Sequence, residues 1–414
     1  MESKKTNIPK RRFAGFSDAW EQRKLSEVAD IIGGGTPSTG VAEYWDGDID
    51  WYAPAEINDQ IYVDCSERKI TRLGLENSSA KILPANKTVL FTSRAGIGKT
   101  AILRHEGATN QGFQSMVLND ETNPYFVFSM SSTIKEKAER VASGSTFAEI
   151  SGKMLGNLEF CFPSNAEQDK IGGYFENLDH LITLHQRKLD KLKDMKKSYL
   201  SEMFPQPGEK KPRRRFKGFT EDWEQRKLGS LVIDHNAGIY ISKEDYGSGT
   251  NVIGVGNIYD NDIFDGEIYR LGPVNDDRFL LEENDLIYGE SSLVPEGIAR
   301  TVCVGKNGVG SAFAWHTRRV KLDQNLVNSH FATLELNYNI AIRKYLMSVS
   351  TQTALTGMTT EGYFGATLVL PSVKEQAVIS EFFKNLDHLI TLHQRKLDKL
   401  KNIKQAYLNE MFVK

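Results

Sequence analysis

The sequence predicts an α/β protein of the α+β type, built from two mixed, strand-rich blocks and two long helices. The segment at residues 177–193 recurs unchanged at residues 385–401. A second segment, at residues 12–25, recurs with few changes at residues 215–228. Long duplications of this kind indicate the internal organisation before any local propensity is considered. Each half is therefore expected to contain a leading segment, a block and a long helix, related to the other half by a pseudo-two-fold.

Each copy of the 177–193 segment lies within a predicted long helix. Apolar side chains recur along both helices at alternating steps of three and four residues, which is the pattern of a coiled-coil seam. A Ser-x-x-Glu sequence begins each helix, at residues 164–167 and 372–375, and this predicts a capping box. The residues predicted to line the seam are Ile171, Phe175, Leu178, Ile182, His185, Leu189 and Leu192, with Ile379, Phe383, Leu386, Ile390, His393, Leu397 and Leu400 as their counterparts.

A single helix of this kind leaves its apolar stripe uncovered, and the twin helix of the same chain is the nearest partner. We expect the two helices to pair within the chain, with polar residues such as His185 and Lys196 setting the register. Pairing with a second molecule is the alternative. A parallel pair would set the blocks side by side, whereas an antiparallel pair would set them at opposite ends.

The remaining sequence divides around these helices. The first block contains the glycine-rich turn at residues 33–39, several short β-type runs and a helix that Asn123 and Pro124 would begin and that would end near Ala142. The second block repeats this order of features with a different amino-acid sequence, and a helix is expected near residues 339–348. The expected domains are a leading segment (1–25), the first block (26–161), the first helix (162–204), a basic proline-rich linker with the repeated leading segment (205–228), the second block (229–369) and the second helix (370–414).

The leading segments each contain an aromatic trio, Phe13, Phe16 and Trp20 in the first half and Phe216, Phe219 and Trp223 in the second. We expect these side chains to pack onto the helix pair or the adjoining block. A docking surface for a partner protein is the alternative.

Composition narrows the class of protein. The 414 residues are 40% hydrophobic, which is enough for two or three domains with hydrophobic cores. The net charge is −2, so the chain lacks the overall positive charge of a simple nucleic-acid-binding protein. The three cysteines lack the spacing of metal ligands, which favours free thiols in a reducing compartment. The first twelve residues are polar and no apolar run reaches membrane-spanning length, so a cytoplasmic protein is expected.

No catalytic, cofactor-binding or metal site is predicted. Residues 95–100 resemble the end of a phosphate-binding loop, but Ser93 stands where the first glycine belongs and the following residues read as a strand. Asn123-Pro124 is interpreted as a helix start rather than a methyltransferase motif. His180 and His185 lie five apart on a helix, a spacing more typical of packing than of metal ligation.

The signal for nucleic-acid contact is local. Amides after one strand suit adenine edges, and basic residues of the second block suit phosphates. The candidates are Thr36, Ser38, Ser93, Arg94, Asn110, Gln111, Gln114, Lys243, Glu290, Ser291, Ser292, Arg318 and Arg319.

The whole chain resembles the DNA-specificity subunit of type I restriction–modification enzymes. The resemblance rests on the twofold order of segment, block and helix, and on motifs that are most specific in the first block. These motifs are GGTPS (34–38), YWDGDIDW (44–51), LFTSRAGIG (90–98), TNQGF (109–113) and a Pro-Ser-x-x-Glu-Gln sequence that starts each helix, at residues 163–168 and 371–376.

The resemblance implies that each block is a target-recognition domain for one half of a bipartite, asymmetric DNA sequence. It also implies that the helices form an antiparallel pair that sets the gap. The chain itself would be no enzyme. Its partners would be double-stranded DNA, two methyltransferase subunits that use S-adenosylmethionine, and motor–nuclease subunits that use ATP and Mg. The alternatives are a coiled-coil assembly scaffold without DNA readout, and a stand-alone methyltransferase or nuclease.

Overall fold

The computed structural model describes residues 7–94, 96–142, 149–255, 258, 263–264, 269–352 and 355–413. Contacts divide the chain into unit 1, which comprises Met1–Arg187 and Gln394–Lys414, and unit 2, which comprises Lys188–His393. The division passes through both long helices, α6 (Asn165–Glu202) and α10 (Val373–Glu410). Each unit therefore contains one block and a part of each long helix.

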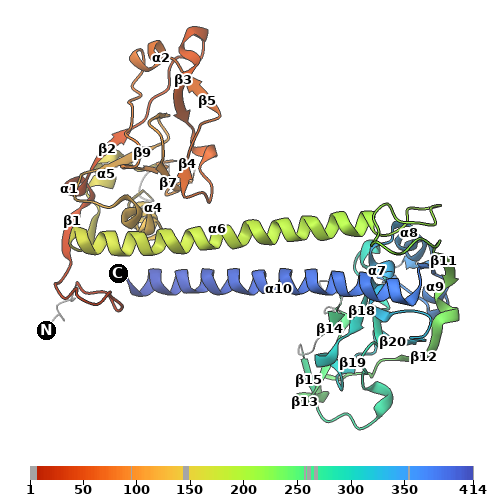
Figure 1. Ribbon diagram of the computed structural model, residues 1–414. Helices are drawn as coiled ribbons and strands as arrows, with labels where there is room; N and C mark the ends of the chain where they lie inside the picture. The colour runs from red at the N-terminus through yellow and green to blue at the C-terminus, as the bar shows by residue number, and fades with distance from the viewer. Residues whose placement is uncertain are drawn as a thin grey trace. The chain divides into compact units, whose positions relative to one another are not determined.

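The first block is built on a five-stranded sheet and a smaller three-stranded sheet. In the large sheet the neighbours are antiparallel except for β4 and β7, which run parallel. The small sheet lies at the end of the block farther from α6 (Figure 1). The large sheet has the order β2 (Ala29–Gly33), β9 (Gln114–Leu118), β6 (Thr88–Phe91), β7 (Thr100–Leu103), β4 (Tyr62–Val63), and the small sheet has the order β5 (Arg68–Ile70), β3 (Trp45–Tyr52), β8 (Ala108–Thr109).

The second block repeats this topology strand for strand, as the shared order of sequence features predicted. A further small sheet of β17 (Ser291–Ser292), β22 (Thr356–Gly357) and β21 (Thr351–Gln352) is added. The large sheet has the order β12 (Val232–Ala237), β20 (Thr317–Leu322), β16 (Leu286–Gly289), β18 (Thr301–Val304), β14 (Ile263–Phe264), and the small sheet has the order β15 (Tyr269–Leu271), β13 (Tyr246–Ile253), β19 (Ala312–Phe313).

Each leading segment is joined to the end of its block by a strand pair. In unit 1, β1 (Glu21–Lys24) pairs antiparallel with β10 (Glu159–Phe162), and in unit 2, β11 (Glu224–Lys227) pairs with β23 (Thr367–Leu370) in the same way. The short helix α1 (Leu25–Val28) follows β1. These pairs bring the start and the end of each block together at the start of its long helix.

The block helices begin at asparagine caps. The Asn123 side chain accepts a hydrogen bond from the Phe126 amide at 2.9 Å, so the predicted helix start is confirmed. The predicted single helix is two helices, α3 (Pro124–Ser129) and α4 (Ser131–Ala142), divided at Met130. The second-block helix predicted near residues 339–348 is α8 (Ile340–Val349). Helix α7 (Ser329–Tyr338) was not predicted from the sequence. The shorter helices of the blocks include α2 (Arg72–Glu76), α5 (Gly152–Gly156) and α9 (Thr360–Phe364).

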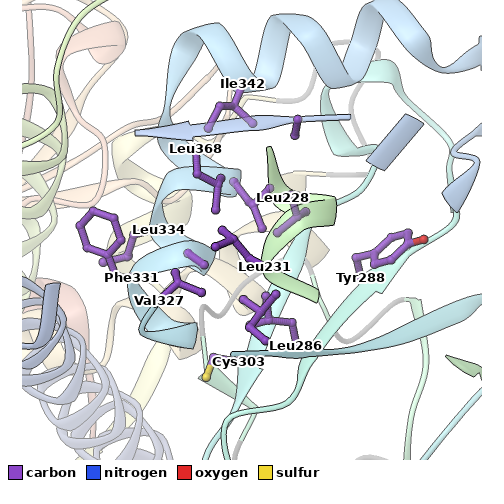
Figure 2. Close-up of a cluster of buried hydrophobic side chains, with 14 of the residues drawn as sticks. Leu228, Leu231, Leu286, Tyr288, Cys303, Val327, Phe331, Leu334, Ile342 and Leu368 are labelled. Atoms are coloured by element: carbon purple, nitrogen blue, oxygen red, sulfur yellow. The ribbon is translucent and has the colours of Figure 1, made fainter. Parts of the chain in front are cut away.

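The core of the second block forms where its large sheet meets α7 and α8. Strands β16 and β18 are buried along their whole length, as expected for strands covered on both faces. Figure 2 shows Leu286, Tyr288 and Cys303 from these strands among side chains from the helices and from the start of the block. The other labelled members of this cluster are Leu228, Leu231, Val327, Phe331, Leu334, Ile342 and Leu368.

The two long helices run antiparallel within each unit. In unit 1, Tyr174 of α6 packs on Tyr407 of α10 with ring centroids 5.5 Å apart, and Asp179, further along α6, pairs with Lys404, earlier in α10, at 2.6 Å. The predicted pairing within the chain is therefore confirmed. Of the predicted seam residues, Ile171, Phe175, Leu178, Leu189, Ile379, Phe383, Leu386 and Leu397 are buried, and Ile182, His185, Leu192, Ile390, His393 and Leu400 are half-buried.

Unit 2 contains a second copy of the same contact with the roles of the helices exchanged. Tyr199 packs on Phe382 with centroids 5.0 Å apart, and Lys196 pairs with Asp387 at 2.8 Å. Lys196 was predicted as a register residue, and the structure shows that it acts through an ion pair. This repeated contact is the internal repeat that the duplicated sequence predicted.

The predicted capping boxes are only partly confirmed. At the second helix the Ser372 hydroxyl accepts a hydrogen bond from the Glu375 amide at 3.4 Å, as predicted, but the glutamates of both boxes form ion pairs with the leading segments. The Glu167 carboxylate accepts hydrogen bonds from Nε and Nη2 of Arg12, both at 2.7 Å. In unit 2, Glu375 binds Arg215 in the same way, at 2.6 and 2.7 Å. The box prediction was wrong for these glutamates because an arginine distant in sequence offers two strong donors.

The aromatic residues of the leading segment pack onto the helices and the block, as predicted. Phe13 contacts Tyr174 with centroids 5.9 Å apart, and the buried Trp20 lies between Phe126 of the block and Phe412 of the chain end. Phe16 is half-buried. In unit 2, Phe216 packs on Phe382, and Trp223 packs on Phe204 and Phe331.

Candidate functional site

Two loops of the first block lie against each other, and they carry most of its predicted contact residues. A Cβ on Gly34 would lie 1.9 Å from the Asn110 carbonyl oxygen, so glycine is required for this close approach. The approach brings the glycine-rich turn beside the loop after β8. The Thr36 hydroxyl then donates a hydrogen bond to Oε1 of Gln111. Thr36 is half-buried and Gln111 is exposed, so the pair lies at the surface of the block.

The neighbouring polar candidates are partly held by the backbone. Oδ1 of Asn110 accepts a hydrogen bond from the Gly112 amide at 2.7 Å, which leaves the amide NH2 as the group that this side chain can offer. Gln114 is half-buried at the first position of β9, opposite Gly33. Ser38 is exposed and Arg94 is half-buried.

Ser93 is placed inside the block, which corrects its prediction as a surface contact. The side chain is fully buried. Its backbone amide donates to the Gly112 carbonyl at 2.8 Å, and its carbonyl accepts from the Ile150 amide at 3.0 Å. The Ser93 backbone therefore ties the loop between β8 and β9 to the segment before α5.

The second block has the same close approach with different side chains around it. A Cβ on Gly238 would lie 2.0 Å from the Ala314 carbonyl oxygen. The position that Thr36 and Gln111 occupy in the first block is taken by Tyr240 and Trp315. Their rings meet edge to face with centroids 5.4 Å apart, at an angle of 67°. Tyr240 is 68% exposed and Trp315 is 47% exposed.

Tyr240 and Trp315 were not among the residues predicted from the sequence. The available signal was the Gly-x-Tyr sequence at residues 238–240, which corresponds to Gly-x-Thr at residues 34–36. The sequences of the two blocks differ too much for this correspondence to be assigned before the shared strand order is known.

Three charged candidates of the second block, Glu290, Arg318 and Arg319, are engaged in ion pairs. Arg318 binds Glu290 at 2.6 Å, with both side chains partly exposed. Arg319 binds Asp234 at 2.7 Å, and its side chain is only 4% exposed. Its prediction as a phosphate contact is contradicted by this burial.

The remaining candidates of the second block are less accessible than predicted, or their side chains lie outside the residues that the structure describes. Ser292 is buried, which corrects its prediction as a surface contact, and Ser291 is half-buried. The side chain of Lys243 lies outside the described residues.

The described residues contain no group of three or more histidine, cysteine, aspartate or glutamate side chains placed to bind a metal ion. None of the described helices combines the length and the apolar character that crossing a lipid bilayer requires. What the two loop clusters offer chemically is a set of hydrogen-bonding groups in one block and a pair of aromatic rings in the other.

Comparison with known proteins gives one consistent family. The model of the type I restriction modification DNA specificity domain matches residues 17–194 and again residues 220–402. The chain is 35% identical over 185 residues to the type I restriction enzyme MjaIX specificity subunit of Methanocaldococcus jannaschii, covering 44% of this chain and 41% of that protein. It is 25% identical over 225 residues to the EcoR124I/EcoR124II specificity subunit of Escherichia coli, covering 50% and 54%. The matched segments thus span about half the length of these two relatives.

A solved structure supports the fold over the whole chain. The S subunit of a type I restriction-modification system from M. genitalium superposes with a TM-score of 0.64 and 14% identity, covering 98% of this chain and 99% of that one. At 14% identity, this match supports the fold alone.

Proposed function

This chain belongs to the type I restriction modification DNA specificity family, and we propose that it is the DNA-recognition subunit of a type I restriction–modification complex. Each block binds one half of a bipartite, asymmetric target. The long helices set the length of the unread gap and carry the docking sites for methyltransferase subunits. The chain supplies recognition and no catalytic group of its own.

The observation that carries this proposal is a constant backbone with different side chains at one point. Both blocks share one strand order and one glycine contact, at Gly34 in the first block and Gly238 in the second. At that contact, one block presents Thr36 and Gln111 and the other presents Tyr240 and Trp315. Two readers with the same frame and different contact groups fit a target whose two halves differ in sequence.

The outward face of the repeated helix segment supports a partner that binds twice. The seam explains why inward residues recur, but Leu181 and Leu184 are exposed, and so are their copies Leu389 and Leu392. Two neighbouring exposed leucines on one helix face, present in both copies, are a candidate apolar contact patch. The same subunit would bind each copy, as two methyltransferase subunits in one complex would.

The chemistry of the complex is assigned to other subunits. Methyl transfer would use S-adenosylmethionine in the methyltransferase subunits, and cleavage would use ATP and Mg in motor–nuclease subunits. A weak net charge suits a chain whose partners supply much of the phosphate contact. The protein would act in the cytoplasm, where its DNA target is.

The test exchanges the first block and maps methylation. The chain is co-expressed with its methyltransferase subunit, and residues 26–161 are replaced by the corresponding block of another family member. Methylated adenines are then mapped on genomic DNA. We expect one half of the target to change while the other half and the gap length stay the same.

A matched variant controls for disturbance of the helices. Replacing only exposed Lys193 and Lys197 of α6 by glutamine, on a different helix face from Leu181 and Leu184, should leave the mapped target unchanged. A chimera in which both halves change, or neither, would refute modular recognition. A complex that assembles but binds DNA without any sequence preference would favour the coiled-coil scaffold instead.

A further inference from the structure

The second block presents a pair of contacting aromatic rings to solvent. Tyr240 and Trp315 meet edge to face, and the Trp315 ring also lies 3.8 Å from the ring of His316, centroid to centroid. Tyr and Trp contribute large contact areas to interfaces at low cost in side-chain entropy.

The position of these rings in the fold identifies their ligand. They occupy the site that Thr36 and Gln111 occupy in the first block, beside an equivalent close approach of a glycine, where an added Cβ would lie 2.0 Å from a carbonyl oxygen, against 1.9 Å in the first block. Under the proposed function, this is the point at which each block contacts its half of the DNA target. The ligand of the rings is therefore a base pair of the second half-site.

One ion pair beside the rings, Arg318 with Glu290, is neutralised, and the rings themselves offer apolar surface. The Glu290 amide donates to the His316 carbonyl at 2.9 Å, which places the Glu290–Arg318 ion pair beside the aromatic loop. Three residues after Glu290, Leu293 is 86% exposed. Of the groups that base pairs present in the major groove, the 5-methyl of thymine is the apolar one.

We propose that Tyr240 and Trp315 recognise a thymine of the second half-site through its 5-methyl group, whereas Thr36 and Gln111 recognise the first half-site through hydrogen bonds. This inference rests on the proposed function and specifies the chemistry of one of its two contacts. The two blocks thus have the same protein fold but contact base edges differently, one through hydrogen bonds and the other through apolar contact.

The test removes the methyl group from the DNA. The complex of the full chain with its methyltransferase subunits is titrated with duplexes carrying the mapped target, in which each thymine of the second half-site is replaced in turn by deoxyuridine. We expect one replacement to weaken binding about fourfold, the effect of withdrawing one buried methyl group. Trp315→Ala should weaken binding to the thymine duplex and remove the difference between thymine and deoxyuridine.

Two variants serve as controls. Tyr240→Phe keeps the ring and should keep the preference for thymine. Gln111→Ala, in the first block, should weaken binding while leaving that preference intact. Because Trp315 is 47% exposed and outside the buried core, its alanine variant is expected to fold, and thermal unfolding of the purified complex checks this.

Several outcomes would overturn the inference. These are a second half-site without thymine, binding that is indifferent to deoxyuridine at every position, and a Trp315→Ala variant that loses affinity equally for both bases, as stacking between base pairs would require. Failure of the proposed function is a separate result, because the wild-type complex would then show no preference for any target sequence.

Discussion

Lys404 of α10 lies 2.6 Å from Asp179 of α6, and the duplicated counterparts of these residues form the matching pair of Lys196 with Asp387. The Asp179 side chain is 6% exposed, and it also accepts a hydrogen bond from the Tyr125 hydroxyl at 2.8 Å. Asp179 thus joins the block to both long helices within unit 1. An apolar seam alone does not specify whether the helices run parallel or antiparallel. A charge pair does, because its two residues meet in only one of these directions.

Replacing Lys404 by alanine is expected to lower the free energy of unfolding of unit 1 by roughly 2–3 kcal/mol, because Asp179 would stay buried without its cation. Urea unfolding followed by tryptophan fluorescence measures the change. Lys401→Ala removes an exposed lysine of the same helix and should cost less than about 0.5 kcal/mol. Adding Asp179→Asn to Lys404→Ala should recover part of the loss, and equal losses at Lys404 and Lys401 would contradict this role.

Replacing Arg12 by alanine is expected to release the leading segment from the start of α6. Glu167 is buried, and Arg12 supplies two of its hydrogen bonds, so the loss should be roughly 3–5 kcal/mol, as for other broken buried pairs. Faster amide hydrogen exchange over residues 7–20 would report the release. Arg12→Lys should restore only part of the stability, since lysine cannot make the bidentate contact.

The neighbouring arginine is the matched control. Arg11 pairs with Glu410, but both side chains are exposed, and such pairs contribute about 0–1 kcal/mol. Arg11→Ala should therefore leave exchange over the leading segment nearly unchanged. If Arg11→Ala and Arg12→Ala behave alike, burial of the Glu167 pair is not what holds the segment.

The helix pair and the order of the blocks could be predicted because they depend on periodicity and duplication, both of which are properties of the sequence itself. The contact residues could not be predicted in the same way. Ser93 and Arg319 have residue types that suit DNA, but whether a loop side chain turns outward depends on its neighbours in space. Burial of Ser93 beneath the loop of Gly112, and capture of Arg319 by Asp234, are tertiary effects.

Tyr240 and Trp315 were missed for a related reason. Their equivalence to Thr36 and Gln111 follows from a backbone contact between segments far apart in the chain, and the residues on either side of that contact have diverged. The recurring glycine was visible in the sequence, but its meaning required the strand order of both sheets.

Glu335 gives the second block a dependence of stability on pH. Its side chain is fully buried in α7, and burial raises its pKa from 4.5 to about 8. The folded protein therefore retains a proton that the unfolded chain releases above pH 4.5. Stability contributed by this group is fully present below that pH and is lost as pH rises toward 8, with a slope of at most about 1.4 kcal/mol per pH unit.

Glu335→Gln keeps the shape of the side chain and an oxygen that can accept the Val369 amide proton, donated at 3.2 Å in the wild type, while removing the ionisable group. We expect the variant to be more stable than the wild type at pH 8. Its free energy of unfolding should also lack the decrease with rising pH that Glu335 causes in the wild type. Urea unfolding between pH 5 and pH 8.5 measures both. Glu283→Gln, at an exposed position of the same block, should follow the wild-type curve; a Glu335→Gln variant that also follows it would exclude the buried glutamate as the cause.

The exposed leucines of the repeated helix segment predict how many partner subunits bind. Leu181 and Leu184 are three residues apart and so share one face of α6, and Leu389 and Leu392 repeat them on α10. Changing either pair to aspartate should reduce the number of bound methyltransferase subunits from two to one, and changing all four should reduce it to none, because each charge would be desolvated at the interface. Native mass spectrometry of the co-purified complex counts the subunits. Val141→Asp alters an exposed apolar residue of α4 outside the repeat and should retain two; a fourfold variant that also retains two would place the docking surface elsewhere on the chain.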